Sequence, residues 1–519
     1  MIGAGTVIVI GSGPAGAAAA HELVRQGCDV TLLEAGSRRP EGMLVRLIGR
    51  NVFRRQHKQR MEDGNAEVVL PDLHPHMQQM DEVNVDVTST DHRPQWWYDI
   101  ALGGLSNHWT GAVPRFAPED FHEGERLHER YRWPLSYHDL VPYYERLERL
   151  LFVTSDPRDV PNLPASKPVY SRCLSRDWEQ VAAQAKCMGQ GMTVMPLADG
   201  HPCMVVGRST AFNSFTNLIA PLIRSPHFHL ISGAHALRVE YSGATRRVEA
   251  VVYMDKATNT EHRLEALAVV VACGALHSTK LLFDSACPEF PNGLGNTSGL
   301  LGRYLHDHPR DWWTFELEKP LSRPSPPVYL TRLPYRTSAP LEATSWTIGL
   351  LPSTGEKLLS LTPLKTTSFA TQVFGTMVPT ERNYVEPDAM RKDSFGLPKL
   401  NICIKFDESV VPRLSSARDH LLSLLEDAGY RGALTRTPTC ITPGESVHMG
   451  GTVRMHASPE HGVLDGWNRM HEIPNLLVVD ASCFTTGAEK NPTLTAMALA
   501  ARAANRLVQD LSRGGSIED

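Results

Sequence analysis

A short apolar strand followed by three glycines places the strongest constraint on what this chain can fold into. In "TVIVIGSGPAGAAAAHELVRQG", which begins at Thr6, Gly11, Gly13 and Gly16 form G-x-G-x-x-G between a β-branched run and an alanine-rich run. In a strand–turn–helix unit the first glycine allows a tight turn, the second admits a pyrophosphate, and the third allows close helix packing. The helix N-terminus then points its positive end at the phosphates. We therefore predict a dinucleotide-binding α/β unit here.

Glu34 is the acidic residue that such a unit requires. It ends the second predicted strand, "DVTLLEAG", about 20 residues after the glycines, where an acid binds a ribose hydroxyl. A carboxylate at this point disfavours a ribose 2′-phosphate because like charges repel. The glycine pattern alone leaves NAD and FAD open. A second strand–glycine–helix element, "LAVVVACGALHSTKLL" at 267–282, is typical of flavin folds and favours FAD.

The chain of 519 residues is too long for one simple core. Its α/β patterns lie at both ends, and the middle alternates like strands, for example in "WWTFELEK" and "LNICIKF". We predict an α/β fold with a Rossmann-like FAD-binding domain built from discontinuous segments, and a substrate domain with a mainly antiparallel sheet. The predicted FAD-binding segments are 1–39, 207–310 and 441–519; the substrate domain takes 40–206 and 311–440 and includes a cofactor-covering loop at 95–116.

Composition excludes several classes of protein. The net charge is −5, and the one basic cluster, Gly49–Arg60, suits a solvated face better than an anionic partner, so we expect no nucleic acid. Nine scattered cysteines form no C-x-x-C pair, which favours a reducing compartment and argues against a disulfide framework or a zinc site. We see neither a signal peptide nor a membrane-spanning apolar run. The expectation is a cytoplasmic protein with no membrane partner, and its oligomeric state is left open.

Further motifs occur in a fixed order along the chain. They are "LGGLSNHWTGAVPRF" (102–116), "LGRYLHDHP" (301–309), "VHMGGTVRMHASPEHGVLD" (447–465), "IPNLLVVDASCF" (473–484) and "KNPTLTAMALAARAANRL" (490–507). Together with the glycine pattern they resemble the glucose–methanol–choline (GMC) oxidoreductases, which are FAD-dependent alcohol oxidases and dehydrogenases. H-x-G-G-T, "NPTLTAM" and S-N-H-W-T most resemble the branch of pyranose 2-oxidase and bacterial sugar and glycoside oxidases. The resemblance is thin over 38–92 and 320–374.

The resemblance implies two catalytic residues. His448 matches the family's base, which removes the hydroxyl proton while the carbon loses a hydride to flavin N5. A neutral imidazole suits this task because its pKa lies near the working pH. Asn491 matches the partner that orients the substrate oxygen by hydrogen bonding.

The residues around Asn491 also predict a helix start. "NPTLTAMALAARAANRL" puts Asn491 at the N-cap and Pro492 at the first helical position. The free amides of Thr493 and Leu494, at the positive helix end, would stabilise negative charge at the N1–C2=O edge of a reduced flavin. Asn491 as a cap alone is the alternative, and both roles are compatible.

Other residues are predicted to contact the cofactor. The resemblance places His108 at the flavin, either bonded to its 8α-methyl group or packed against the ring edge, and both interpretations stay open. Asp480 resembles the residue that contacts the pyrophosphate or ribityl chain; capping the next turn is the alternative. Also predicted to lie against the cofactor are Gly103, Gly104, Ser106 and Ala236. For "HDHP" at 306–309 we expect a structural loop and no metal site.

The leading hypothesis is oxidation of a CH–OH group on a carbohydrate-like small molecule, with oxygen or another electron acceptor. The alternative is an oxidase or dehydrogenase for the primary hydroxymethyl group of an aminoglycoside or other natural product. The acids Asp81, Glu82, Asp86 and Asp91 would suit a cationic aminosugar, but a solvated acidic loop is the better interpretation. An NAD(P)H-linked flavin reductase would need a second glycine-rich site, and we find none. A non-catalytic flavoprotein would be expected to lack His448 or Asn491.

Overall fold

The computed structural model describes most of the chain. The basic cluster Gly49–Arg60 and the four acids from Asp81 to Asp91 lie outside the described residues. The described ranges are 5–38, 78–79, 83–84, 96–199, 202–203, 208–209, 212–322, 325–331, 346–352, 368–434 and 441–513.

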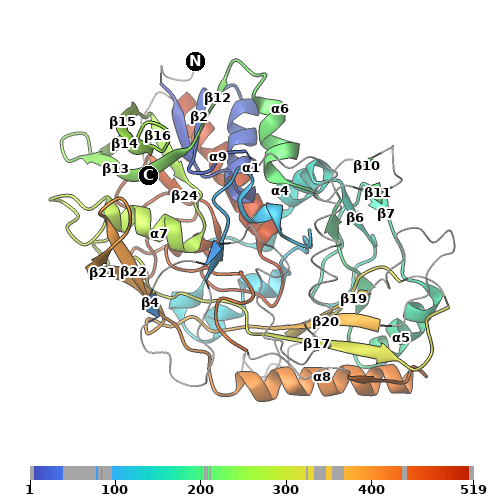
Figure 1. Ribbon diagram of the computed structural model, residues 1–519. Helices are drawn as coiled ribbons and strands as arrows, with labels where there is room; N and C mark the ends of the chain where they lie inside the picture. Colours follow the sequence, from blue (N-terminus) through green and yellow to red (C-terminus); the bar gives the residue numbers. More distant parts are fainter. Residues whose placement is uncertain are drawn as a thin grey trace.

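Five strands that are far apart in the sequence form one parallel sheet (Figure 1). Val7 pairs with both Val30 and Ala268, and every neighbouring pair is parallel. Four of the strands are buried along their whole length, as expected where both faces are covered. The predicted assembly of an α/β domain from separated segments is confirmed, while its boundaries stay a prediction. The strand order is β12 (Phe228–Ser232), β2 (Val30–Glu34), β1 (Val7–Ile10), β16 (Ala268–Val271) and β24 (Leu476–Val478).

Two long helices pack against each other beside this sheet. They are α1 (Pro14–Arg25) and α9 (Thr493–Ser512), and Figure 1 shows them next to each other. The alanines of α1 are buried and permit this close approach. The prediction that Asn491 caps α9 is wrong by one residue, since Pro492 is the N-cap. The Asn491 side chain is instead bonded to Tyr329 and His448, so it cannot fold back onto the helix.

The three glycines of the first turn have different neighbours. Gly11 has φ +103°, and a β-carbon there would lie 2.4 Å from the Ala272 carbonyl oxygen. A β-carbon on Gly16 would lie 2.0 Å from the Gly11 carbonyl oxygen. A β-carbon on Gly13 would meet no atom within 4 Å. Gly11 and Gly16 are therefore required by packing, whereas Gly13 leaves open space.

A second, antiparallel sheet lies in the other half of the molecule. Burial alternates along β17, as expected for a sheet whose two faces differ. Helices α8 (Val410–Asp427) and α5 (Arg176–Cys187) pack on this sheet and on each other; in Figure 1, α8 runs beneath β17 and β20. The predicted mainly antiparallel sheet is confirmed. Its order is β23 (Gly432–Leu434), β17 (Arg310–Leu317), β20 (Ser368–Gly375), β19 (Trp346–Pro352), β18 (Val328–Leu330) and β8 (Met192–Val194).

Shorter elements complete the fold. Helix α7 (Ala275–Asp284) follows β16 directly, as the sequence predicts. Within the described ranges no helix combines the length and the apolar character needed to cross a bilayer. The remaining elements are β3 (Gln78–Gln79), β4 (Val83–Asn84), β5 (Trp97–Tyr98), η1 (Gly104–Asn107), η2 (Pro118–Phe121), η3 (Gly124–Arg126), η4 (Glu129–Tyr131), α4 (Tyr137–Leu150), β6 (Val153–Ser155), β7 (Tyr170–Ser171), β9 (Leu197–Ala198), β10 (Pro202–Cys203), β11 (Arg208–Ser209), η5 (Phe215–Ile219), α6 (Ala220–Leu222), β13 (Ala234–Ser242), β14 (Arg247–Asp255), β15 (Thr260–Glu265), β21 (Tyr384–Lys392), β22 (Pro398–Cys403) and η7 (Ala481–Cys483).

The two alanine variants of this turn are expected to behave differently. Gly16→Ala should lower the free energy of unfolding by about 1–3 kcal/mol, because the new methyl group must displace backbone. Gly13→Ala should leave the stability of the cofactor-free protein unchanged, because its methyl group meets nothing. Thermal unfolding of both cofactor-free variants measures the difference. Equal loss of stability in the two would contradict the packing described here.

Candidate active site

Two loops from different parts of the chain pair in antiparallel register. His306 donates its amide to the Gly450 carbonyl at 3.1 Å and accepts from the Gly450 amide at 2.9 Å. His308 lies two residues after His306, and His448 lies two residues before Gly450. In antiparallel register these two histidines face each other, and their Nδ1 atoms are 3.0 Å apart. A β-carbon on Gly451 would lie 2.5 Å from His306 Nδ1, which explains the glycine pair in "HMGGT". This pairing brings the two histidine rings together.

Asp307 anchors the loop that carries His448. Its buried carboxylate accepts hydrogen bonds from the Gly444 amide at 2.7 Å, the Ser446 hydroxyl, and the His448 amide at 3.1 Å. Val447, within this loop, has φ +58°, a left-handed conformation that a β-branched residue rarely adopts. The Asp307 carboxylate binds the residues before and after Val447, Ser446 and His448, and so holds this conformation in place. The predicted structural loop at "HDHP" thus positions the neighbouring histidine.

Asn491 and Tyr329 complete a hydrogen-bonded chain. The Tyr329 hydroxyl, from β18, donates to Asn491 Oδ1 at 2.6 Å. Asn491 Nδ2 then lies 3.3 Å from His448 Nε2. Because an amide nitrogen can only donate, Nε2 of His448 accepts, and the imidazole proton sits on Nδ1, facing His308. The chain therefore fixes the tautomer in which the His448 Nε2 lone pair is an acceptor, bonded here to Asn491 Nδ2. The sequence patterns had pointed to neither Tyr329 nor His308 as part of the site.

The three clustered histidines are held in their neutral form. Burial lowers the pKa of His448 well below 6.5, and the neighbouring His308 and the Arg310 charge lower it further. Burial, with His306 nearby, lowers the pKa of His308 to about 3. Burial also lowers the pKa of His306 to about 4. A neutral imidazole at His448 can accept a proton.

One cavity of about 460 Å³ joins this pair to the glycine turn. Gly16, which belongs to the predicted nucleotide-binding glycine pattern, and Gly103, which was predicted to lie against the cofactor, do not line the cavity. Gly16 serves the packing of α1 described above. The predicted residues that line the cavity are Gly11, Gly13, Glu34, Gly104, Ser106, His108, Ala236, His448, Asp480, Asn491 and Thr493.

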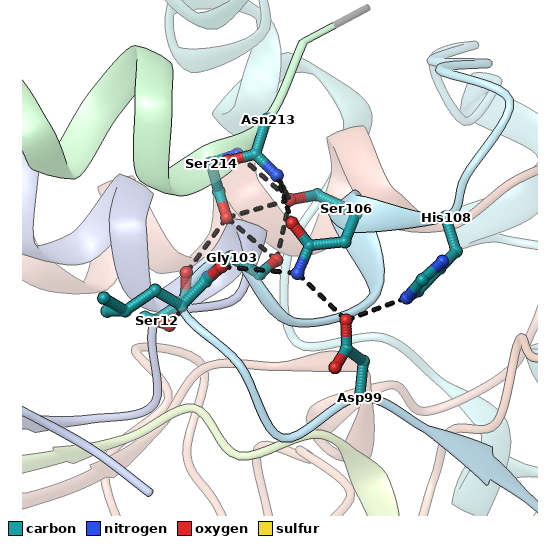
Figure 2. A network of polar contacts seen from close by, with 9 residues as sticks. Ser12, Asp99, Gly103, Ser106, His108, Asn213 and Ser214 are labelled. Atoms are coloured by element: carbon teal, nitrogen blue, oxygen red, sulfur yellow. Dashed lines mark hydrogen bonds and ion pairs between the residues drawn. The ribbon is translucent and has the colours of Figure 1, made fainter. Parts of the chain in front are cut away.

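A buried polar network ties the loop before η1 to the glycine turn (Figure 2). The Gly103 amide donates to Ser12 Oγ at 3.0 Å, and Gly103 has φ +98°, which favours glycine. The Ser106 hydroxyl donates to the Gly103 carbonyl at 2.6 Å, and the Ser214 hydroxyl donates to the Ser12 carbonyl at 2.9 Å. Gly103 therefore supports the turn from behind, and the next residue, Gly104, borders the cavity.

His108 lies on the cavity wall with a carboxylate beside it. Figure 2 shows its ring reaching Asp99, and Nε2 lies 2.8 Å from Asp99 Oδ2. Asn107 Nδ2 donates to the same oxygen at 2.9 Å. Asp99 thus sets the orientation of the imidazole that faces the cavity.

The two predicted acids hold backbone turns that border the cavity. Glu34 accepts from the Ser12 amide at 3.0 Å and from the Gly36 amide at 2.8 Å. Asp480 accepts from the Gly274 amide at 3.1 Å and from the Ser482 amide at 2.9 Å, so it caps η7 while lining the cavity. Burial raises the pKa of both carboxyl groups.

The residues present fit a dinucleotide. β-carbons on Gly13 and Gly274, both on the cavity wall, would meet no atom within 4 Å, so bare backbone faces the space. The first residues of α1 and α9, Pro14 and Thr493, also line it, so two helix N-termini favour negative charge there. Among the described residues no group of three or more histidine, cysteine or acidic side chains is arranged to hold a metal ion.

Arg454 and His456 hold the loop that follows "HMGGT". The fully buried Arg454 guanidinium lies 4.1 Å from the Tyr304 ring centre and donates to the Arg130 carbonyl. His456 Nε2 lies 3.1 Å from the Glu129 carbonyl oxygen. Both side chains therefore bind the segment around η4, away from the cavity.

Comparison with known proteins identifies the family. Residues 23–310 and 379–500 match the N- and C-terminal profiles described as GMC oxidoreductase. The chain is 28% identical to 6'''-hydroxyparomomycin C oxidase of Streptomyces lividus, over 98% of this chain and 92% of that one. It is 25% identical to C-glycoside 3-oxidase of Arthrobacter globiformis, over 98% and 95% of the two chains. Pyridoxine 4-oxidase from Mesorbium loti shares the fold, with a TM-score of 0.62 and 17% identity over 96% and 98% of the chains. The predicted cofactor, FAD, is that of this family of alcohol-oxidising flavoproteins, and the chain belongs to the GMC oxidoreductases.

Proposed function

We propose that this enzyme oxidises a CH–OH group of a carbohydrate-like substrate, with His448 as the base and Asn491 as the group that orients the substrate oxygen. The observation that carries the proposal is the lone pair at His448 Nε2, on the wall of a cavity that also contains the glycine turn. FAD, when bound, supplies the redox chemistry by accepting the hydride at N5.

The proposed proton transfer uses the hydrogen-bonded chain around His448. The substrate hydroxyl replaces Asn491 Nδ2 at the single Nε2 lone pair, and its proton then moves to His448 because the imidazole is neutral. The Asn491 Nδ2 donor, released from Nε2, donates to the substrate oxygen. The positive charge that then develops on His448 is stabilised where its Nδ1–H donates to His308. Tyr329 keeps the Asn491 amide from turning over.

The other cavity residues are proposed to hold FAD. The backbone of Gly11, Gly13 and Gly104 is proposed to contact FAD directly. The Glu34 carboxylate, which already accepts the Ser12 amide, is proposed to accept a further hydrogen bond from a ribose hydroxyl. The N-terminus of α9 at Thr493 favours negative charge on the part of the cofactor that lies against it. Also proposed to contact FAD from the cavity wall are Ser106, Ala236 and Asp480.

Acid precipitation of the protein distinguishes the two interpretations of His108, a covalent bond to the flavin and packing against its ring edge. Asp99 orients the ring toward the cavity, which supports contact with the flavin. Flavin that stays in the protein pellet means a covalent bond, and flavin in the supernatant means packing alone.

The substrate class rests on the relatives. Their names designate oxidation of a hydroxyparomomycin and of a C-glycoside at position 3, which supports a carbohydrate-like alcohol here. The former, an aminoglycoside oxidase, supports the alternative of a primary hydroxymethyl group. The free cysteines Cys28, Cys173, Cys187, Cys273, Cys287, Cys403 and Cys483 support a cytoplasmic location.

His448→Ala should retain FAD and lose about 10²–10⁴-fold in kcat, because only the proton acceptor is removed. The matched control is His229→Ala, which removes an exposed histidine of β12. Flavin absorbance per chain and anaerobic flavin reduction measure the two properties. Full turnover in His448→Ala would remove the base assignment.

The acid limb of the kcat/KM profile should lie below pH 6.5, because the pKa of His448 is lowered from that value. The neutral form of the base is then fully present at pH 6.5 and is lost only as the pH falls through the lowered pKa. A pH series on the purified enzyme with one saturating acceptor measures the limb. An inflection at or above 6.5 would contradict the buried, neutral base.

His308→Leu should lower kcat on the order of 10–100-fold, the range for partners that orient a functional imidazole. Leucine cannot accept the His448 Nδ1 proton, so the productive tautomer loses its support. His308→Asn offers an amide oxygen near the same point and should recover part of the rate. Equal rates in the two variants would show that His308 only fills space.

A further inference from the structure

The substrate side of the cavity has a wall that the proposed chemistry does not use. Arg310 and Trp312 on β17 pair in register with Phe374 and Gln372 on β20. Residues two apart on a strand share a face, so these four side chains point the same way. All four line the cavity that also contains His448 and Asn491.

Arg310 presents a charge without a bonded partner in the described part of the chain. We find no hydrogen bond or ion pair from its guanidinium to a described residue; its one close contact is the Trp312 ring, 5.4 Å away. The acids whose charge acts on it are Glu445 and Asp307. Asp307 already accepts three hydrogen bonds from the His448 loop. No described residue therefore occupies the donors of this guanidinium, which lines the cavity and can bind a ligand there.

The neighbouring side chains suit a sugar. The Gln372 amide also lines the cavity, and we find no hydrogen bond from it to a described residue. It can bind a hydroxyl as donor or as acceptor. The Trp312 ring offers an apolar face to the C–H side of a pyranose. A cation, an amide and an indole on one sheet face form a built subsite.

We propose that Arg310, Gln372 and Trp312 bind a carboxylate-bearing sugar, so that the substrate is an acidic carbohydrate. The guanidinium fork matches a carboxylate in two parallel hydrogen bonds. A cationic aminosugar would instead be repelled by Arg310. The inference rests on the proposed function, and it favours sugar acids over aminoglycosides within it.

The test compares three pyranoses that differ in charge: D-glucuronate, D-glucose and D-glucosamine. Each is added anaerobically to the FAD-loaded enzyme. The change in the visible flavin spectrum gives the half-saturating concentration, and bleaching gives the rate of oxidation. Glucuronate should half-saturate at a concentration about tenfold or more below that of glucose, as expected for hydrogen bonds to a charged group. Glucosamine should bind no more tightly than glucose.

The variants assign the effect to the guanidinium. Arg310→Met should weaken glucuronate binding about tenfold or more and change glucose binding less than about twofold. Arg310→Lys keeps the charge without the fork and should fall between. The control is Arg303→Met, since Arg303 lies outside the cavity lining and stacks on Tyr384. Retained flavin and an unchanged melting temperature verify that Arg310→Met is folded.

Three outcomes are distinguishable. Glucuronate that binds through Arg310 without any bleaching by a sugar would support the subsite and overturn the proposed oxidation. Bleaching by glucose with no preference for glucuronate would overturn the subsite and leave the oxidation standing. Equal weakening of all three sugars in Arg310→Met would also overturn the subsite, because it would show that the guanidinium does not recognise the carboxylate.

Discussion

The site depends on one buried carboxylate. Asp307 satisfies the Gly444 amide, the Ser446 hydroxyl and the His448 amide, which surround the strained backbone of Val447. Each of these donors would cost about 1–3 kcal/mol if it were left buried and unpaired. The antiparallel pairing next to Asp307 then determines which side chain faces His448. The position of the proposed base is thus set by contacts to its main chain, while its ring nitrogens contact only the side chains of His308 and Asn491.

The hydrogen-bonded chain crosses from one sheet to the other. Tyr329 belongs to the antiparallel sheet, whereas Asn491 precedes the helix that packs on the parallel sheet. The tautomer of His448 therefore depends on how the two halves meet, since a displaced Tyr329 would free the Asn491 amide to rotate. Ligand sites commonly lie where such units meet. Here the interface also decides which ring nitrogen can accept a proton.

The nucleotide-binding half could be predicted from the sequence because local motifs specify it. Part of the site could not be predicted, because contacts between distant segments form it. The glycine turn and the buried strand before α7 are each specified within about 20 contiguous residues, so periodicity and turn chemistry suffice. His448 and Asn491 were predicted only through the family resemblance, because spacing does not show convergence. His308 was missed because its partner is 140 residues away and the pairing between the loops has no sequence signature. The N-cap prediction for Asn491 failed for the same reason, since tertiary hydrogen bonds outcompete a local cap.

The proposed subsite and the base influence each other through charge. Burial lowers the pKa of His448 most, and His308 and the Arg310 guanidinium lower it further, so the free enzyme holds a neutral but weak base. A carboxylate bound at Arg310 would offset that positive charge and make His448 more basic when the substrate is in place. A neutral alcohol would leave the charge uncompensated and the base weak. The same guanidinium would then contribute to substrate discrimination twice, first in binding and again in proton transfer, because the base is strengthened only by a ligand of the matching charge.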